Sequence, residues 1–293
     1  RPAVDGVTAE IPAGSFFVAL GPSGCGKSTL LRLIAGLETL DGGAIALDGQ
    51  PVAGPGLHVA PEARGVGVVF QSYALWPHMS VARNVSFPIE ATGTAKRAAL
   101  AEAQQHLAAV SLESFAERRP AALSGGQRQR VALARCLASR ARTVLMDEPL
   151  ANLDPHLRHA MEEELASFHR RAEVTTLYIT HDQREAMALA DLVAVMREGR
   201  FAQVAPPETV YARPTDAHVA RFIGRSAVLP VTVERVEAGQ AVARAGDWRL
   251  TLACAEGAAA GSGQAVIRPE DVEADPDGRP ATVRSVSYRG GVW

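Results

Sequence analysis

Short, nearly all-apolar runs alternate along the chain with longer stretches that have a helical pattern. The apolar runs are residues 15–20, 67–70, 144–146 and 176–179. Continuous apolar runs of this length are typical of strands in a parallel sheet that is buried on both faces. The helical stretches are residues 97–110, 127–138 and 155–171. Strands that alternate with helices in this way predict an α/β fold.

Polar residues closely follow each of the four predicted strands. They are the glycine-rich run after Leu20, then Gln71, the pair Asp147 and Glu148, and His181. Open α/β sheets bind ligands outside the carboxyl ends of their strands, so these groups are expected to gather at one edge of the sheet. This convergence is stronger evidence for a ligand site than any single motif.

The pattern changes in the last third of the chain. A hairpin is predicted around residues 197–200, and short alternating runs from residue 227 onward, broken by glycine and proline, predict a small all-β domain. The predicted domains are 1–205 with a helical region at about 72–140, a linker helix at 206–225, and a β domain at 226–293. The chain opens on Arg1 and stops at Trp293 inside a strand-like run, so both ends are expected to be cut and the β domain to be incomplete.

Composition narrows the environment in which the chain works. There are 30 Lys and Arg residues against 32 Asp and Glu, a formal charge of −2, so no global field draws the chain to nucleic acid or to an anionic membrane. The cysteines Cys25, Cys136 and Cys254 form no CxxC pair, which favours a reducing compartment. No run approaches the roughly 18 apolar residues of a spanning helix, so any work at a membrane is expected to involve docking.

Residues 21–28 (GPSGCGKS) fit the phosphate-binding loop G-x-x-x-x-G-K-[ST], between a predicted strand and a helical stretch at 29–36. Its glycines let backbone N–H groups close on phosphate oxygens at the positive end of a helix. Lys27 is expected to reach the β- and γ-phosphates, and Ser28 to ligate Mg²⁺. A plain glycine-rich turn before a helix is the alternative, which the complete order of strand, loop, Lys-Ser pair and helix disfavours. The predicted nucleotide contacts of this loop are Gly21, Pro22, Ser23, Gly24, Cys25, Gly26, Lys27, Ser28 and Thr29.

Two further motifs carry candidate chemistry. In residues 144–148 (VLMDE), Asp147 is placed to hold Mg²⁺ through water and Glu148 to polarise an attacking water. A charged turn would explain this pair equally well without the phosphate loop upstream. In residues 123–127 (LSGGQ), Ser124 precedes a helix and the glycines offer a second anion site, although an ordinary N-cap is the better explanation of the serine alone. One nucleotide does not need two phosphate sites in one fold, so a second subunit would explain this turn.

The motifs GPSGCGKST, Gln71, LSGGQRQR, VLMDEP, ANLD and His181 occur in an order and spacing that resemble those of ABC ATPases. The resemblance covers nearly the whole chain, and LSGGQ is highly specific because other P-loop enzymes lack it. It implies a P-loop NTPase core with an inserted α-helical subdomain. It also implies a head-to-tail dimer in which the LSGGQ turn of one subunit closes over ATP held by the other. The residues that would act in trans are Ser124, Gly125, Gly126 and Gln127.

Several residue roles follow from the resemblance alone. Gln71 looks like the residue that senses the γ-phosphate and Mg²⁺, His181 resembles the switch histidine that contacts the γ-phosphate, and Asp154 resembles the residue that links the two sites across the dimer. Outside this context, a strand-end glutamine would more often be a surface residue and a lone histidine structural. The implied catalytic residues are Glu148, His181, Gln71 and Lys27, and the implied Mg²⁺ ligands are Ser28, Gln71 and Asp147.

The class of transporter is indicated by two segments. Residues 73–84 (YALWPHMSVARN) are expected to expose aromatic and apolar residues to a coupling helix of a membrane subunit, with core packing as the plain alternative. Residues 265–272 (AVIRPEDV) resemble a motif of the OB-like domain in ATPases of sugar, polyamine, iron and phosphonate importers. The resemblance thus implies an ATP-hydrolysing importer subunit at the cytoplasmic face of the inner membrane. Its partners would be a like ATPase subunit, two transmembrane permease subunits and, indirectly, an external solute-binding protein.

The sequence departs from the family at the adenine side, because residues 1–14 contain no aromatic residue to stack on the base, and residues 224–229 lack an asparagine common in relatives. Two other functions remain alternatives. A soluble ABC ATPase acting on nucleic acid or the ribosome is disfavoured by the single phosphate loop and the near-neutral charge. A binding module with an inactive ATPase site is disfavoured by the complete set of catalytic residues.

Overall fold

The computed structural model describes residues 1–151, 153, 155–224, 226–254 and 257–272. The chain divides into two compact units, Arg1–Val219 and Ala220–Trp293. One predicted site residue, Asp154, lies outside the described residues. No helix in the described ranges is both long enough and apolar enough to cross a membrane.

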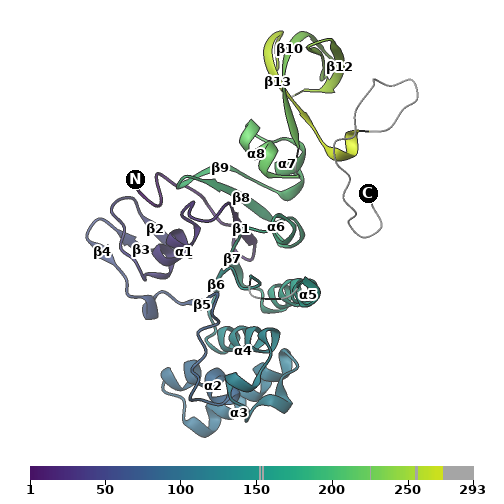
Figure 1. The fold of residues 1–293 in the computed structure, drawn as a ribbon. Helices are drawn as coiled ribbons and strands as arrows, with labels where there is room; N and C mark the ends of the chain where they lie inside the picture. The colour runs from purple at the N-terminus through teal and green to yellow at the C-terminus, as the bar shows by residue number, and fades with distance from the viewer. Residues whose placement is uncertain (152, 154, 225, 255–256, 273–293) are drawn as a thin grey trace. The chain divides into compact units, whose positions relative to one another are not determined.

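A mainly parallel sheet forms the centre of the first unit (Figure 1). Its strands are β1 (Phe16–Leu20), β5 (Val66–Val69), β6 (Thr143–Asp147), β7 (Thr175–Thr180), β8 (Leu192–Arg197) and β9 (Arg200–Ala205). They lie in the order β5-β6-β7-β1-β8-β9; the pairs from β5 to β8 are parallel, and β9 is antiparallel to β8. The α/β prediction is confirmed, and the predicted strands match to within one residue at each end. The predicted hairpin is the turn between β8 and β9.

Helices cover both faces of this sheet. They are α1 (Lys27–Ala35) on one face, and α5 (Pro155–Ala172) with α6 (Gln183–Leu189) on the other. Alternate residues of a strand point to opposite faces, and accordingly Phe17 packs in one cluster with Leu31 of α1 while the ring of Phe16 lies 5.0 Å from that of His169 in α5. Because both faces are covered, every residue of β1 is buried, as the continuous apolar pattern predicts.

A small antiparallel sheet near α1 has no counterpart in the sequence prediction (Figure 1). It consists of β2 (Ile45–Leu47), β3 (Gln50–Gly54) and β4 (Leu57–His58). The strands are too short to show a period of two, and β3 begins on an exposed glutamine and proline. The turn between β2 and β3 has Asp48 and Gly49 at positive φ, 49° and 75°, which suits a tight hairpin.

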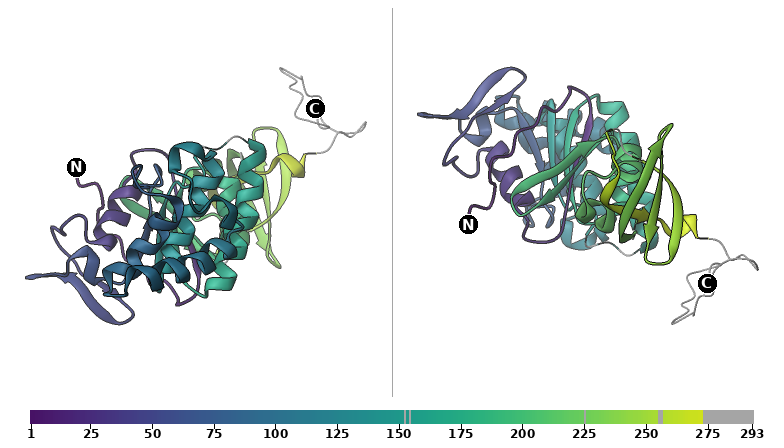
Figure 2. Two further views of the ribbon diagram at one scale, coloured as in Figure 1. Left: turned by 90° about the horizontal axis from the view of Figure 1, so that it is seen from below. Right: turned by 90° about the horizontal axis from the view of Figure 1, so that it is seen from above.

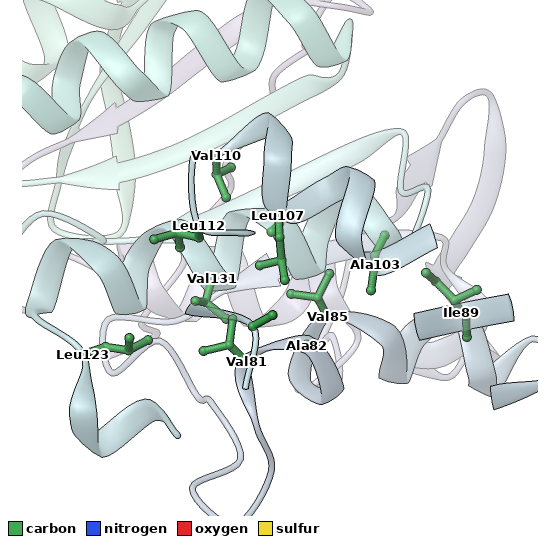
Figure 3. Packing of buried hydrophobic residues seen from close by; sticks show 14 residues of the cluster. Val81, Ala82, Val85, Ile89, Ala103, Leu107, Val110, Leu112, Leu123 and Val131 are labelled. Carbon is green, nitrogen blue, oxygen red and sulfur yellow. The ribbon is translucent and has the colours of Figure 1, made fainter. Parts of the chain in front are cut away.

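Three helices form a separate core beside the β5 edge of the main sheet (Figures 1 and 2). They are α2 (Val81–Ala91), α3 (Lys96–Ala109) and α4 (Gly125–Ala138). Figure 3 shows side chains of all three pointing toward one another, among them Val85 of α2, Leu107 of α3 and Val131 of α4, each 0% exposed. Short 3-10 turns join or extend the helices and strands: η1 (Pro61–Ala63), η2 (Glu113–Phe115), η3 (Pro120–Ala122) and η4 (Pro269–Asp271).

Two short helices follow β9, and a second sheet lies in the C-terminal unit. The helices are α7 (Pro207–Ala212) and α8 (Ala217–Phe222); the strands are β10 (Ala227–Glu237), β11 (Gln240–Ala245), β12 (Trp248–Ala253) and β13 (Gly261–Ile267). These strands are antiparallel in the order β12-β11-β10-β13, around a small core of Val231, Ala243 and Ala265. The OB-like assignment of residues 226–293 stays a prediction, and the strand-like run near Trp293 lies outside the described residues.

Candidate functional site

The glycine loop between β1 and α1 is shaped by contacts that only glycine permits. A Cβ on Gly21 would overlap the backbone carbonyl of Met196 in β8, and one on Gly26 would overlap the carbonyl of Ala3. Gly26 is also left-handed, with φ of 108°, and it begins α1 without a side-chain cap. The first N–H groups of α1 are therefore not occupied by a capping side chain, which is the arrangement that a helix start offers to an anion.

The predicted residues of the loop are placed unequally. Pro22, Ser23, Gly24 and Ser28 are exposed, whereas Gly21, Cys25 and Lys27 are buried. Lys27 is 4% exposed, and its ammonium group donates to the carbonyl oxygens of Gly21 at 2.8 Å and Pro22 at 3.0 Å. The loop therefore folds around its own lysine and holds the ammonium group with two backbone carbonyl oxygens.

Ser28, at the start of α1, meets Asp147 at the end of β6. The Ser28 hydroxyl donates to Asp147 Oδ1 at 2.9 Å. A hydroxyl and a carboxylate are hard oxygen ligands of the kind that Mg²⁺ prefers, and Mg²⁺ usually takes only one or two side chains besides phosphates and water. The described residues contain no cluster of three or more His, Cys, Asp or Glu suited to a metal.

Glu148 and His181 form a second pair. They directly follow Asp147 and Thr180, the last residues of β6 and β7. His181 Nδ1 lies 3.1 Å from Glu148 Oε2, and their side chains are 54% and 19% exposed. Glu148 is left-handed, with φ of 44°, and its N–H donates to the carbonyl of Ile179 in β7 at 3.0 Å. Non-glycine residues in this region are strained and are held there by their surroundings. The neighbouring strand thus fixes the backbone of Glu148, and its carboxylate contacts His181.

A buried network that the sequence analysis missed supports His181. Glu185 of α6, 3% exposed, accepts hydrogen bonds from Thr180 Oγ1 at 2.6 Å and from Tyr178 Oη at 2.8 Å. Thr180 Oγ1 in turn accepts from the N–H of Asp182 at 3.0 Å, so the backbone is fixed on both sides of His181. Burial raises the pKa of Glu185, against the lowering effect of the two hydroxyl donors. The available signal was a glutamate four residues after a strand-end histidine, which is too common to stand out in one sequence.

Arg158 of α5 joins this network from the opposite side. Its guanidinium lies 3.4 Å from Asp182 Oδ2 and 3.9 Å from Glu185 Oε1, and it donates to the carbonyl of Leu153 at 3.3 Å. The side chains of Arg158, Asp182 and Glu185 line a small pocket together with Glu148, Ala151, Thr180 and His181. The arginine therefore connects the segment after Glu148 with the segment that carries His181.

The remaining predicted residues belong to other elements of the fold. Gln71 is exposed and follows β5, the strand beside β6. Ser124 is the N-cap of α4: its hydroxyl accepts from the N–H of Gln127 at 3.3 Å, and Gln127 Oε1 accepts from the N–H of Ser124 at 2.9 Å. This reciprocal capping box is the ordinary structural role. Ser124 is nonetheless exposed and Gly125 and Gln127 are partly exposed, whereas Gly126 is buried.

The segment after Gln71, expected to serve docking with some of its side chains in the core, buries Tyr73 and leaves Trp76 partly exposed. The Tyr73 side chain is 5% exposed, and Trp76 is half-buried with its ring 4.6 Å from that of Phe87. The backbone carbonyls of Tyr73 and Ala74 accept hydrogen bonds from the buried guanidinium of Arg135 in α4. Phe87, 41% exposed, is the large apolar side chain that this region does present to solvent.

Comparisons with known proteins agree with this geometry. Residues 4–151 match the ABC transporter family. The chain is 52% identical to an sn-glycerol-3-phosphate import ATP-binding protein of Rhizobium johnstonii, over 78% of this chain and 60% of that protein. It is 51% identical to a spermidine/putrescine import ATP-binding protein of Pseudomonas aeruginosa, over 80% of this chain and 64% of that protein. The chain thus spans somewhat less than two thirds of these relatives' length.

Two further comparisons extend the likeness. A spermidine/putrescine import ATP-binding protein of Rubrobacter xylanophilus is 44% identical over 98% of this chain and 77% of its own length. The dimeric structure of the ATP-binding cassette MJ0796 in a post-hydrolysis state with ADP and Pi superposes with a TM-score of 0.60 at 27% identity, over 70% of this chain and 90% of that chain. The glycine loop, the two side-chain pairs at the strand ends and these likenesses lead to one conclusion: the chain belongs to the ABC transporter family.

Proposed function

We propose that this chain binds ATP with Mg²⁺ and, as one of two like subunits, hydrolyses it to drive solute import through membrane partners. The observation that carries the proposal is the placement of Ser28 against Asp147 and of His181 against Glu148, next to the glycine loop. Two neighbouring parallel strands, β6 and β7, deliver both pairs to the same edge of the sheet as the phosphate loop after β1.

Nucleotide binding would use the loop and its lysine. The N–H groups at the start of α1 suit phosphate oxygens, and the Lys27 ammonium is held by two neutral carbonyl oxygens. A charge-assisted bond to a phosphate is stronger than a bond to a neutral carbonyl, so an arriving triphosphate would compete favourably for this lysine. Ser28, Asp147 and Gln71 would hold Mg²⁺, which neutralises charge on the β- and γ-phosphates when bound.

Hydrolysis would depend on the second pair. Glu148 has a carboxylate oriented by its strained backbone and by His181, so it can align a water for attack and accept its proton. His181 is half-exposed beside it and can donate to the γ-phosphate from its other ring nitrogen. Such catalysis is mostly positioning and charge stabilisation.

The LSGGQ turn would complete the site of a second subunit. Ser124 is exposed at the start of α4, and the related cassette MJ0796 is described as dimeric. Gly125, Gly126 and Gln127 would share this role, as would Asp154 in linking the two sites. The apolar surface around Phe87 and Trp76 would receive a membrane subunit, which places the chain at the cytoplasmic face of the membrane.

The relatives favour transport over the nucleic-acid alternative. Their names refer to import of glycerol phosphate and of spermidine or putrescine, and to uptake of diacetylchitobiose. These solutes have little chemistry in common, so the cargo is expected to be chosen by the membrane subunits and an external binding protein. The ATPase chemistry would be shared among them.

Glu148→Gln tests the proposal. The amide keeps the size of the side chain but cannot accept the proton, so turnover should fall by about 10²–10⁴-fold while ATP binding remains. Light scattering should then show an ATP-dependent dimer that persists. Glu163→Gln, at a carboxylate 77% exposed on α5, is the matched control and should behave as the unmodified chain. A Glu148→Gln protein that turns over at the unmodified rate removes Glu148 from its role, and an unmodified chain that fails to bind ATP refutes the function.

A further inference from the structure

The backbone just after Gln71 is strained at two consecutive residues. Tyr73 and Ala74 have φ of 62° and 44°. Left-handed conformations cost L-residues about 1–2 kcal/mol each, and neither residue is a glycine, asparagine or aspartate that would tolerate them. Such strain persists only where the surrounding structure over-determines it. Other side chains must therefore hold Tyr73 and Ala74 in this conformation. Because the two residues lie close to Gln71, a proposed Mg²⁺ ligand, the same side chains would also position Gln71.

Arg135, in the last turn of α4, holds the two strained residues. Its Nη1 donates to the carbonyl of Ala74 at 2.7 Å and its Nη2 donates to the carbonyl of Tyr73 at 3.0 Å. The side chain is 9% exposed, and the guanidinium lies 5.0 Å from the centre of the Trp76 ring. A planar fork with two donors suits two adjacent carbonyls in a way that a lysine does not. Burial lowers the pKa of Arg135, so keeping this cation inside is costly, and the two carbonyls and the ring offset the cost.

Asn84 fixes the far end of the same segment. This residue is 0% exposed; its Oδ1 accepts from the N–H of Trp76 at 2.8 Å, and its Nδ2 donates to the carbonyls of Trp76 at 3.1 Å and Ser80 at 3.0 Å. Trp76 to Ser80 is therefore tied to the start of α2. The chain between Gln71 and α2 has one anchor on α2 and another on α4, and the strained pair lies at the α4 anchor.

Helix α4 also begins with the LSGGQ turn, about three helical turns before Arg135. We propose that Arg135 is a positioning residue: it keeps Tyr73 and Ala74 left-handed and so fixes Gln71 relative to the helix that carries Ser124. The inference rests on the proposed function, since it gives Gln71 and Ser124 their meaning. It adds a specific mechanical link, a guanidinium fork, between the ligand-sensing segment of one site and the turn that closes the other.

Removing the fork should impair turnover more than nucleotide binding. Arg135→Met keeps an unbranched buried side chain but removes the hydrogen-bond donors. Tyr73 and Ala74 can then leave the left-handed conformation, and the position of Gln71 can change. We expect kcat for ATP to fall about tenfold, with KM changed less than threefold because Lys27 and Ser28 are untouched. Arg130→Met is the matched control: Arg130 lies on the same helix and donates to the carbonyl of Val110 at 3.1 Å, within the helical core. Its kcat should stay within twofold of the unmodified chain.

A second substitution distinguishes positioning from simple loss of packing. Glycine adopts positive φ without strain, so Ala74→Gly in the Arg135→Met background should recover at least threefold in kcat. Ala74→Pro makes the reverse test, because proline fixes φ near −65° at an exposed residue. It should lower kcat as Arg135→Met does while α4 is unaltered.

Amide hydrogen exchange of the peptide covering residues 71–79 supplies a readout that does not require turnover. Exchange should rise in Arg135→Met and in Ala74→Pro, and fall again when Ala74→Gly is added to Arg135→Met. Equal exchange in the unmodified chain and Arg135→Met, or equal exchange and kcat in Arg135→Met with and without Ala74→Gly, would overturn the inference. An unmodified chain that binds no ATP would instead overturn the proposed function, and the exchange pattern would still decide whether Arg135 holds the segment.

Discussion

Two glycine-containing turns begin helices in this protein, and they are built differently. The phosphate loop enters α1 through a left-handed Gly26 with no capping side chain, and backbone carbonyls press against Gly21 and Gly26. The LSGGQ turn enters α4 through Ser124, whose hydroxyl already caps an N–H of the helix in a reciprocal box with Gln127. The first turn leaves its helix N–H groups for a ligand, whereas the second satisfies one of them internally.

The two turns are also attached to different parts of the fold. The phosphate loop is attached to a sheet whose strands are fixed by parallel neighbours on both sides, and a Cβ there meets backbone. The LSGGQ turn is attached to a separate three-helix core, and a Cβ on Gly125 would meet only the end of the Leu153 side chain at 3.1 Å. Under the proposed function, the first turn would cradle phosphate by itself, whereas the second would need a second subunit to become a site.

The largest effect is expected in the helical core. Leu107→Ala removes a side chain that is 0% exposed at the centre of the α2–α4 cluster, and such substitutions cost about 2–5 kcal/mol. Chemical denaturation should show this loss of stability. If the two cores are as separate as their contacts indicate, ATP affinity of the folded protein should change less than threefold. A tenfold loss of affinity would show that the cradle depends on the helical core.

The second largest effect is expected for Gly21→Ala in the phosphate loop. The added methyl group would overlap the carbonyl of Met196, a backbone atom that cannot rotate away. Overpacking of this kind costs about 1–3 kcal/mol, and ATP binding should be lost together with stability. A melting temperature equal to that of the unmodified chain would mean that β8 yields at this point. Gly125→Ala is the matched control, because its added methyl group would meet the end of a side chain instead of a backbone carbonyl.

Gly125→Ala should separate stability from function. Alanine is favoured over glycine in the middle of a helix by about 0.5–1 kcal/mol, and Gly125, as the first residue of α4, should gain at most part of this. The contact with Leu153 can be relieved by rotating that side chain. We therefore expect unfolding free energy to stay the same or to rise slightly. ATP turnover should fall in the same protein, because the methyl group occupies the surface offered to the partner's nucleotide. Unchanged turnover in a stable protein would count against a role for this turn in trans.

The smallest effect is a pH dependence. The pKa of Glu185 is raised by burial above its ordinary value of 4.5, so its neutral form is favoured in the folded state. Its contribution to stability is fully present below that ordinary value and is lost as pH rises through the higher folded-state pKa. Glu185→Gln cannot ionise, so its stability relative to the unmodified chain should improve as pH rises from 4 to 7 in urea titrations. An opposite slope would show that Arg158 and the hydroxyl donors outweigh burial at this carboxylate.

The sequence by itself determined the parts that depend on local chemistry. The apolar runs predicted four of the six strands of the main sheet, β1, β5, β6 and β7, to within a residue, because strands buried on both faces are apolar throughout. The phosphate loop was predictable because its function requires glycines and a lysine at fixed spacing. The polar residues after each strand were predictable as a group, since parallel strands end at one edge of a sheet.

Only the tertiary structure decided how those groups pair. The pairs Ser28 with Asp147 and Glu148 with His181 depend on β7 lying between β6 and β1, an order that no local pattern encodes. The same holds for Arg135, which donates to the carbonyl of Tyr73 from 62 residues away in sequence. A residue's hydropathy records whether it is buried, but the partner of a buried charge lies far away in sequence. It is chosen by how the helices pack.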